Sequence, residues 1–150
     1  MKTFIVTLLL GMLAAGCHGF EAKTPAEFVE LESPGYDYRA ASSDGVVIAA
    51  RALKNSPKGT LTFYADVTRR KLREGDGYAL VEEREVTARS GQRGTMLRFG
   101  RDHGGTPHTY VVTLFVTDDR IFVLEAGGAK ADVDAHAAQI DASIAAFVIK

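Results

Sequence analysis

The second half of the chain carries four closely spaced segments whose apolar and polar positions predict β-strands. The predicted strands are Tyr78–Thr87, Gly94–Asp102, His108–Thr117 and Arg120–Ala126. Parallel neighbours would need a crossover connection of about a dozen residues or more, and the connections here are far shorter. The pattern therefore predicts an antiparallel meander of four strands.

Two features of this meander predict where its strands lie in the sheet. Tyr110–Val116 and Ile121–Leu124 are apolar at successive positions, which favours central strands covered by helix on at least one side. Tyr78–Thr87 instead carries consecutive charges from Glu82 to Glu85. Because charge discourages stray pairing at a sheet edge, we expect this strand at an edge.

Upstream of the meander, two apolar-rich segments predict a β-hairpin. Tyr36–Ala41 and Val46–Leu53 are joined by residues 42–45 (Ser-Ser-Asp-Gly), a run of turn formers with glycine late in the loop. Ahead of the hairpin, Ala26–Leu31 fits either a short strand or a turn of helix. After it, residues 55–59 (Asn-Ser-Pro-Lys-Gly) break the pattern.

Helical spacing predicts a first helix between the hairpin and the meander. It begins after Thr60, a residue type that caps helix N-termini, and ends at residues 75–77 (Gly-Asp-Gly). At about 100° per residue, its buried face comprises Leu61, Tyr64, Ala65, Thr68 and Leu72.

A second helix is predicted after residues 127–128 (Gly-Gly). Asp132 and Asp134 fall in its first turn, where the helix dipole stabilises negative charge. Its apolar stripe comprises Val133, Ala137, Ile140, Ile144 and Phe147. We expect this stripe to pack across the sheet, with His136 off the stripe and without a role.

Phe63 and Val67 lie off the main apolar face of the first helix. They either widen the buried face or, together with Lys71, form an exposed surface that binds a partner. The second alternative makes these three residues the candidate partner-binding site.

The basic run from Arg69 to Arg73 on the same helix also has two interpretations. It either binds an anionic lipid headgroup or an acidic partner, or it is a solvated helix face. In the second case we expect ion pairs at i,i+4 spacing between Asp66 and Arg70 and between Arg70 and Glu74.

The N-terminus carries the pattern of a signal peptide. Lys2 precedes an apolar run from Phe4 to Ala15, which is broken only by Thr7 and Gly11. The run is shorter than the roughly 20 residues that span a bilayer, but it fits the h-region of a secretory signal of about 7–15 residues.

The segment Leu-Ala-Ala-Gly-Cys at residues 13–17 resembles the lipobox of bacterial lipoproteins, although Leu13 is one position further from the cysteine than is usual there. The resemblance implies cleavage before Cys17 and attachment of diacylglyceryl and acyl (palmitate) chains to that cysteine. Residue 18 is histidine rather than aspartate, which by the same resemblance favours the outer membrane and a domain facing the periplasm. The alternative is an ordinary secretory signal with a chance cysteine.

The composition of the chain bears on its partners, its folding and its disulfides. The formal net charge is −1, so no electrostatic argument favours nucleic acid as a partner. With 46% hydrophobic and 25% charged residues, the chain has the composition of a folded domain. Cys17 is the only cysteine, so no disulfide can form within the chain.

Catalytic sequence signatures are absent from the chain: neither the G-x-S-x-G and H-E-x-x-H motifs nor a glycine-rich phosphate loop occurs. One group of residues suggests metal binding. If residues 104–107 form a hairpin loop, His103 and His108 stand opposite each other with Asp102 nearby, close enough to share a zinc or copper ion. The alternative is a pair of solvated histidines at a loop tip.

The order hairpin, helix, four-strand meander and C-terminal helix describes an α+β domain with helices packed on an antiparallel sheet. This order, with the aromatic-rich segment around Glu32-Ser33-Pro34-Gly35-Tyr36, resembles the Mog1p/PsbP-like superfamily, which includes DcrB- and PsbP-related lipoproteins. The resemblance implies a protein that is not an enzyme, has no cofactor and acts by binding other proteins.

We therefore expect a signal peptide at residues 1–16, a lipidated tether at 17–25 and a single α+β domain at 26–150. The expected function is that of a lipid-anchored envelope binding or accessory protein, with another envelope protein or a small ligand as its partner. A metal-handling protein or enzyme that uses His103 and His108 is the alternative.

Overall fold

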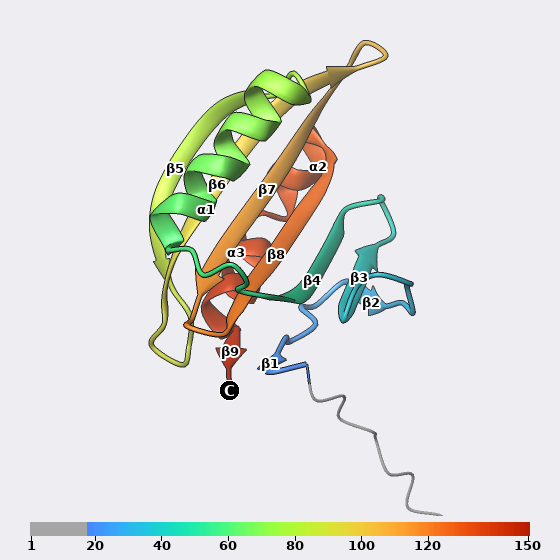
Figure 1. The fold of residues 1–150 in the computed structure, drawn as a ribbon. Helices are drawn as coiled ribbons and strands as arrows, with labels where there is room; N and C mark the ends of the chain where they lie inside the picture. Colours follow the sequence, from blue (N-terminus) through green and yellow to red (C-terminus); the bar gives the residue numbers. More distant parts are fainter. Residues whose placement is uncertain (1–17) are drawn as a thin grey trace, which may run out of the picture.

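A seven-stranded antiparallel sheet organises residues 18–150, which are the residues that the computed structural model describes (Figure 1). The predicted signal peptide and Cys17 lie outside this range. Across the sheet the strands are β2 (Phe28–Glu30), β3 (Tyr38–Ser42), β4 (Val47–Lys54), β8 (Arg120–Ala129), β7 (Thr106–Val116), β6 (Arg93–His103) and β5 (Ala79–Thr87).

The predicted hairpin and meander are confirmed. β3 pairs with β4, and β5 to β8 pair in sequence order, all antiparallel. β7 and β8 are central and the charged β5 is an edge strand, as the sequence predicts. The segment that fitted either a strand or a turn of helix contains strand β2, which pairs with β3 at the other edge.

One side of the sheet is covered by α1 (Leu61–Arg70), which packs on β6 and β7. The helix begins where the Thr60 hydroxyl accepts a hydrogen bond from the Phe63 N–H at 3.2 Å. The predicted helix from Thr60 to residue 75 is confirmed, and its last turn is a wider π-helical segment, η1 (Lys71–Gly75). Leu72 remains buried against the sheet in this turn.

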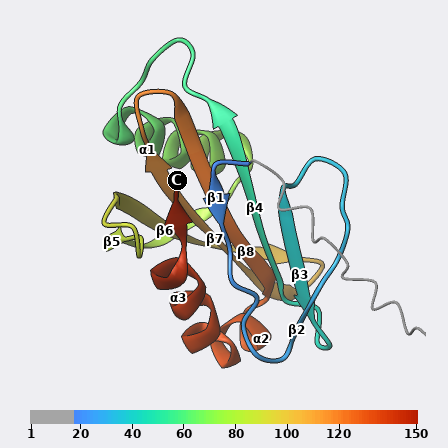
Figure 2. The same cartoon turned by 90° about the horizontal axis from the view of Figure 1, so that it is seen from below.

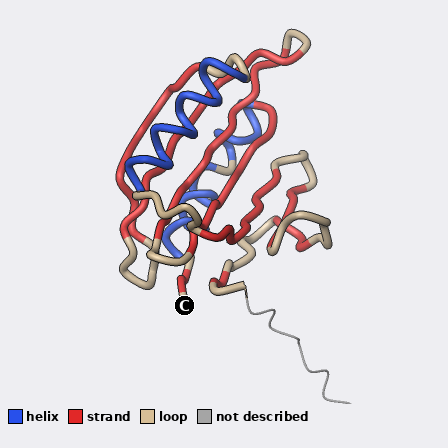
Figure 3. Tube along the Cα trace, in the orientation of Figure 1, coloured by secondary structure: helices blue, strands red, loops and turns tan. Residues whose placement is uncertain are grey.

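The opposite side is covered by two short helices, α2 (Lys130–Ala135) and α3 (Ala137–Ala146) (Figures 2 and 3). The prediction of a single helix is therefore wrong: the chain bends at His136, whose side chain turns inward. The predicted break at residues 127–128 is also wrong, because β8 continues through both glycines, which pair with Tyr110 and Thr109 of β7.

The core on this side is built around aromatic rings. Phe147, directly after α3, stacks on Phe20 at 4.9 Å and on Phe115 at 5.7 Å between ring centroids, and Phe122 contacts it edge-on. Phe20 belongs to β1 (Phe20–Glu21), which pairs with β9 (Val148–Ile149) in a separate two-stranded sheet. Part of the expected tether is thus packed on the domain.

The two sides of the sheet differ in how far they are covered. On the α2–α3 side, the N-terminal segment from Phe20 to Phe28 extends the cover over β3 and β4. On the α1 side, no helix of residues 18–150 lies over β2, β3 and β4 (Figure 1). We call this uncovered area, together with the adjoining part of β8, the open sheet face. No helix in the described range is both long and apolar enough to cross a bilayer.

Candidate functional site

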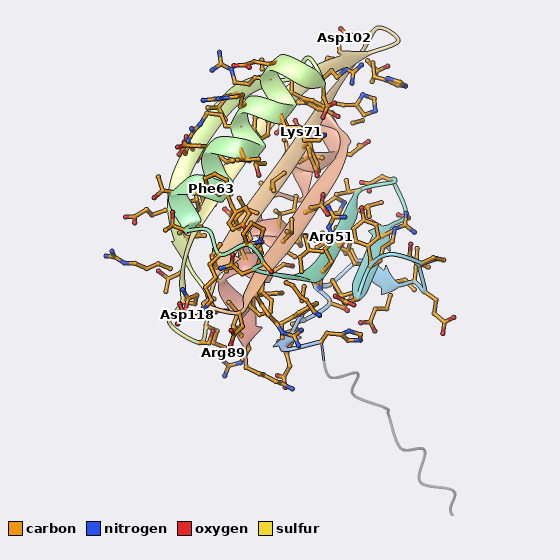
Figure 4. The ribbon with its side chains drawn as sticks, in the orientation of Figure 1. Arg51, Phe63, Lys71, Arg89, Asp102 and Asp118 are labelled. Atoms are coloured by element: carbon orange, nitrogen blue, oxygen red, sulfur yellow. The ribbon has the colours of Figure 1, made fainter. Side chains whose placement is uncertain are left out.

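The three residues of the predicted partner-binding site line one groove, Phe63 and Val67 from α1 and Lys71 from the first position of η1. Figure 4 labels Phe63 and Lys71. Phe63 is 55% exposed and Val67 46% exposed, so they do not widen the buried face. They line a shallow groove of about 520 Å³, which Arg70 and Glu74 complete. We call Phe63, Val67 and Lys71 the α1 ridge.

The charges beside the α1 ridge differ from the expected i,i+4 pairs. Asp66 pairs with Arg69 at i,i+3 spacing, and Arg69 also binds Glu83 of β5 at 2.7 Å. The hydrogen bond to Glu83, followed by that to Asp66, raises the pKa of Arg69. Arg69 reaches the edge strand β5, and Asp66 pairs with Arg69 rather than with Arg70. Arg70 therefore forms no ion pair with any residue of 18–150.

The histidine hairpin is tighter than the sequence suggested. The turn between β6 and β7 consists of two glycines, so His103 pairs with Thr106 and the two histidines are diagonal rather than opposite neighbours. Their rings meet edge to face at 5.6 Å between centroids. Asp102 caps the turn instead, since its carboxylate accepts the Gly105 N–H at 2.9 Å.

Metal ligands do not gather elsewhere in the part of the chain that the structure describes. No group of three or more histidine, cysteine, aspartate or glutamate side chains there is arranged to hold an ion. His108 Nδ1 lies 2.9 Å from the carbonyl oxygen of Thr106, so one nitrogen of this ring has a backbone partner.

His136, which was expected to have no role, is buried and joins two parts of the fold. Its Nε2 lies 2.9 Å from Oδ2 of Asp44, in the turn between β3 and β4, and its ring packs edge-on against Phe28. The Ser42 hydroxyl and then His136 lower the pKa of Asp44. This contact fastens the bend between α2 and α3 to the β3–β4 turn.

A second candidate site lies on the open sheet face, where sequence analysis predicted none. A hollow of about 480 Å³ opens between the β2–β3 loop and the centre of the sheet. Its lining includes Tyr36, Arg39, Ala49, Tyr110, Glu125 and Gly127. These residues come from the loop and from four strands, so their proximity follows from the strand order.

The hollow contains a carboxylate at the centre of the sheet. Glu125 is only 8% exposed and accepts a hydrogen bond from the Tyr110 hydroxyl. Its other oxygen lies 3.6 Å from Nε of Arg51, and both of these atoms lack a hydrogen bond. The Arg51 guanidinium lies over the ring of Tyr36 at 5.6 Å.

A signal for this site is present in the sequence. Arg51 and Glu125 are single charged residues inside otherwise apolar strand segments, and a buried charge without a full set of partners is costly. Such groups are concentrated at functional sites. Burial, and then the Glu125 carboxylate, raises the pKa of Tyr110 well above its ordinary value, so its phenol keeps its proton at pH values where an exposed tyrosine loses it.

The sequence matches no protein-family model and no curated protein. Solved structures with a similar fold include LpqN of Mycobacterium tuberculosis, a protein involved in cell envelope biogenesis. It is 14% identical, with a TM-score of 0.69 over 86% of this chain and 83% of LpqN.

Two further structures agree with this result. The PsbP protein CyanoP of Synechocystis sp. PCC 6803 is 12% identical, with a TM-score of 0.59 over 95% of this chain and 99% of CyanoP. The Ran-binding protein Mog1p of Saccharomyces cerevisiae is 13% identical, with a TM-score of 0.55 over 82% of this chain and 79% of Mog1p. At these identities the likeness concerns the fold, and the chain has the Mog1p/PsbP-like α+β fold that its element order predicted.

Proposed function

We propose that this chain is a lipid-anchored accessory protein of the cell envelope, which binds a partner protein through the α1 ridge. The observation that carries the proposal is the exposure of Phe63 and Val67 on a helix whose other large apolar residues are buried or half-buried. Exposed apolar residues that gather beside a groove are typical of partner sites. The fold of the neighbouring structures, one of them a Ran-binding protein, supports a binding role.

The charges around the α1 ridge indicate the chemistry of the partner. Two charged residues of the groove lining are paired, Asp66 with Arg69 and Lys71 with Asp76 at 2.7 Å. Arg70 and Glu74 are the lining charges without an ion pair in the described part of the chain. A partner surface with an apolar centre and an acidic group that faces Arg70 would complement this groove.

The residue after Cys17 is packed on the domain, so a lipid anchor on Cys17 would hold one particular end of it. His18 follows Cys17 directly, and its Nδ1 lies 2.9 Å from Oδ1 of Asp37 while its carbonyl oxygen accepts a hydrogen bond from Arg120. Lipid on Cys17 would therefore hold the β1–β9 end of the domain close to the membrane. The three acyl chains of a lipoprotein exceed the two membrane signals that stable anchoring requires. We propose the periplasmic face of the outer membrane.

Replacing Cys17 with serine should abolish lipid labelling and leave the protein either uncleaved or released in soluble form. The thiol is the group that the lipid modifies, and a serine hydroxyl does not replace it in this reaction. Metabolic labelling with palmitate and phase partitioning of cell extracts measure the effect. Recovery of the wild-type mature protein in the aqueous phase with unmodified Cys17 would disprove the anchor.

Replacing Phe63 with glutamate should leave folding nearly intact, since exposed substitutions usually change stability by about 0.5 kcal/mol or less. Partner binding should nevertheless fall, because a charge replaces the apolar centre of the ridge. A photo-crosslinking residue at position 67 measures the binding in cells, with and without the Phe63 substitution.

Val81 provides the matched control, because it is 66% exposed, lies on the edge strand β5 and does not line the groove beside the ridge. Val81→Glu should leave the crosslink at position 67 unchanged. Loss of the crosslink in both variants, or in neither, would argue against the α1 ridge as the binding surface.

A further inference from the structure

The hollow on the open sheet face exists because two positions of its floor carry almost no side chain. Ala49 and Gly127 lie on the neighbouring strands β4 and β8. Ala49 pairs with Arg39 on one side and with Glu125 on the other, so these three residues form one row across the sheet. Directly paired side chains have Cβ atoms about 4.5–5.5 Å apart. Arg39 and Glu125 therefore face each other across the space above Ala49.

Arg51 lies beside this row, at the border of the hollow, and contacts Glu125 and Tyr36. Its Nε faces Glu125 at 3.6 Å, and the Tyr36 ring covers one face of the guanidinium. Glu125 is itself held by the Tyr110 hydroxyl. Among residues 18–150, no hydrogen bond joins the outer guanidinium nitrogens of Arg51 to another residue, so the four N–H groups on these two nitrogens remain available.

Arg39 is a half-buried cation without an ion pair in the described part of the chain. The main chain of Arg39 is fixed, since its carbonyl oxygen accepts the Leu31 N–H at 2.9 Å. Asp37, an acid in the same loop, is engaged elsewhere: it accepts the Ala52 N–H at 2.8 Å and contacts His18. Arg39 thus forms no ion pair even with Glu30, Glu32 or Asp37, the acids that line the adjoining pocket with it.

We infer that Arg39, in the lining of the hollow, and Arg51, at its border beside Glu125 and Tyr36, together bind one carboxylate of a partner protein. This inference rests on the proposed function of partner binding and adds a second contact to it. The charged residues of the lining, Arg39 and Glu125, balance each other, and Arg51 at the border brings the local charge to about +1, which suits a monoanion. Guanidinium groups bind carboxylates through paired, charge-assisted hydrogen bonds. A phosphate monoester carries a charge of about −1.5 to −2, which exceeds this local positive charge.

The surroundings of the hollow favour a protein as the source of this carboxylate. Tyrosine and arginine are the residue types that dominate binding energy at protein interfaces, and Tyr36, Tyr110 and Arg39 all line the hollow. Leu31 is exposed beside Arg39 and adds apolar area. An aspartate or glutamate flanked by apolar residues would therefore fill the hollow and cover its rim.

A peptide array tests the inference. It carries nine-residue peptides with aspartate, glutamate, asparagine or glutamine at the centre and varied apolar flanks, and it is probed with the purified lipidated protein in detergent. We expect captured peptides to be acidic at the centre, and capture to fall about tenfold or more in Arg39→Gln, the scale for losing a charged hydrogen-bond partner. Capture that does not depend on the central charge, or no capture at all, overturns the inference.

Arg89 supplies the matched control, because it is an exposed arginine at the opposite end of the sheet, near the C-terminus (Figure 4). Arg89→Gln should leave peptide capture unchanged, and the melting temperatures of both variants show that they fold. Binding of both variants to anionic phosphatidylglycerol vesicles and to neutral phosphatidylcholine vesicles is measured as well. If Arg39→Gln weakens binding to the anionic vesicles and not to the acidic peptides, the anion is a lipid headgroup and the inference is wrong.

The crosslink at position 67 separates this inference from the proposed function. A partner that crosslinks there while the array shows no preference for acidic peptides contradicts the carboxylate site alone. Loss of both signals contradicts partner binding as a whole.

Discussion

Replacing Phe147 with alanine is expected to lower the free energy of unfolding by about 3–5 kcal/mol, the range for large-to-small changes at buried aromatic positions. The Phe147 side chain is 0% exposed and contacts rings from β1, β7 and β8. Its carbonyl oxygen also accepts the Arg89 N–H at 2.8 Å. Loss of the ring would leave a cavity where α3, the main sheet and the β1–β9 pair meet.

Chemical denaturation monitored by circular dichroism measures this effect. Total stabilities of domains are about 5–15 kcal/mol, so the expected loss is a large part of the whole. Val81→Ala serves as the control, because Val81 is exposed and should change stability by about 0.5 kcal/mol or less. A loss below about 1 kcal/mol in Phe147→Ala would mean that the C-terminal segment is not packed on the sheet as the structure shows.

The strands of the meander could be predicted because their signals are local. Short connectors exclude parallel pairing, and the charges of Glu82 to Glu85 mark β5 as an edge strand without any knowledge of its neighbours. The same holds for the exposed side of α1, since the angular position of Phe63 and Val67 follows from helical spacing alone.

Where the prediction failed, the deciding contact is distant in the sequence. The bend between α2 and α3 occurs at His136, whose side chain meets Asp44. The glycines at residues 127–128 remain in β8 because β7 pairs with them. The N-terminal segment is fixed by β9, at the other end of the chain. The local secondary-structure propensity of a segment carries no information about these distant pairings.

The hollow could not be predicted for the same reason. Arg39, Ala49 and Glu125 form a row only because β8 pairs with β4 rather than leaving the meander as an isolated sheet. What the sequence does show is that Glu125 interrupts an apolar strand. That observation identifies Glu125 as an unusual buried charge. It does not identify the arginines that lie near it in the folded sheet.

Replacing Tyr110 with phenylalanine tests the polar centre of the hollow, and we expect it to lower the free energy of unfolding by about 1.5–3 kcal/mol at neutral pH, the scale for a hydrogen bond to a charged group. The Tyr110 hydroxyl is the one described donor within hydrogen-bond distance of the buried Glu125 carboxylate. Phenylalanine keeps the ring in place, so the change removes the hydrogen bond and little packing. Glu125 then has only the longer contact with Arg51.

Tyr78→Phe is the matched control, since Tyr78 packs beside Tyr110 at 5.9 Å between ring centroids and its hydroxyl has no hydrogen bond within residues 18–150. It should change stability by about 0.5 kcal/mol or less. Equal effects of the two substitutions would mean that the Tyr110 hydroxyl contributes nothing specific to the fold.

The pH dependence of the Tyr110→Phe effect provides the sharper test. Burial and the Glu125 carboxylate raise the pKa of Tyr110 above its ordinary value of 10.0, so the folded protein keeps this proton after the unfolded chain has lost it. Deprotonation of the unfolded chain then favours unfolding. Wild-type stability should therefore fall above pH 10 by about 1.4 kcal/mol per pH unit more than that of Tyr110→Phe. The difference between the two proteins should be constant below pH 9 and shrink above pH 10. A difference that stays constant through pH 11 would show that the Tyr110 phenol is not held against Glu125, and the position of the Glu125 carboxylate beside Arg51 would lose its physical basis.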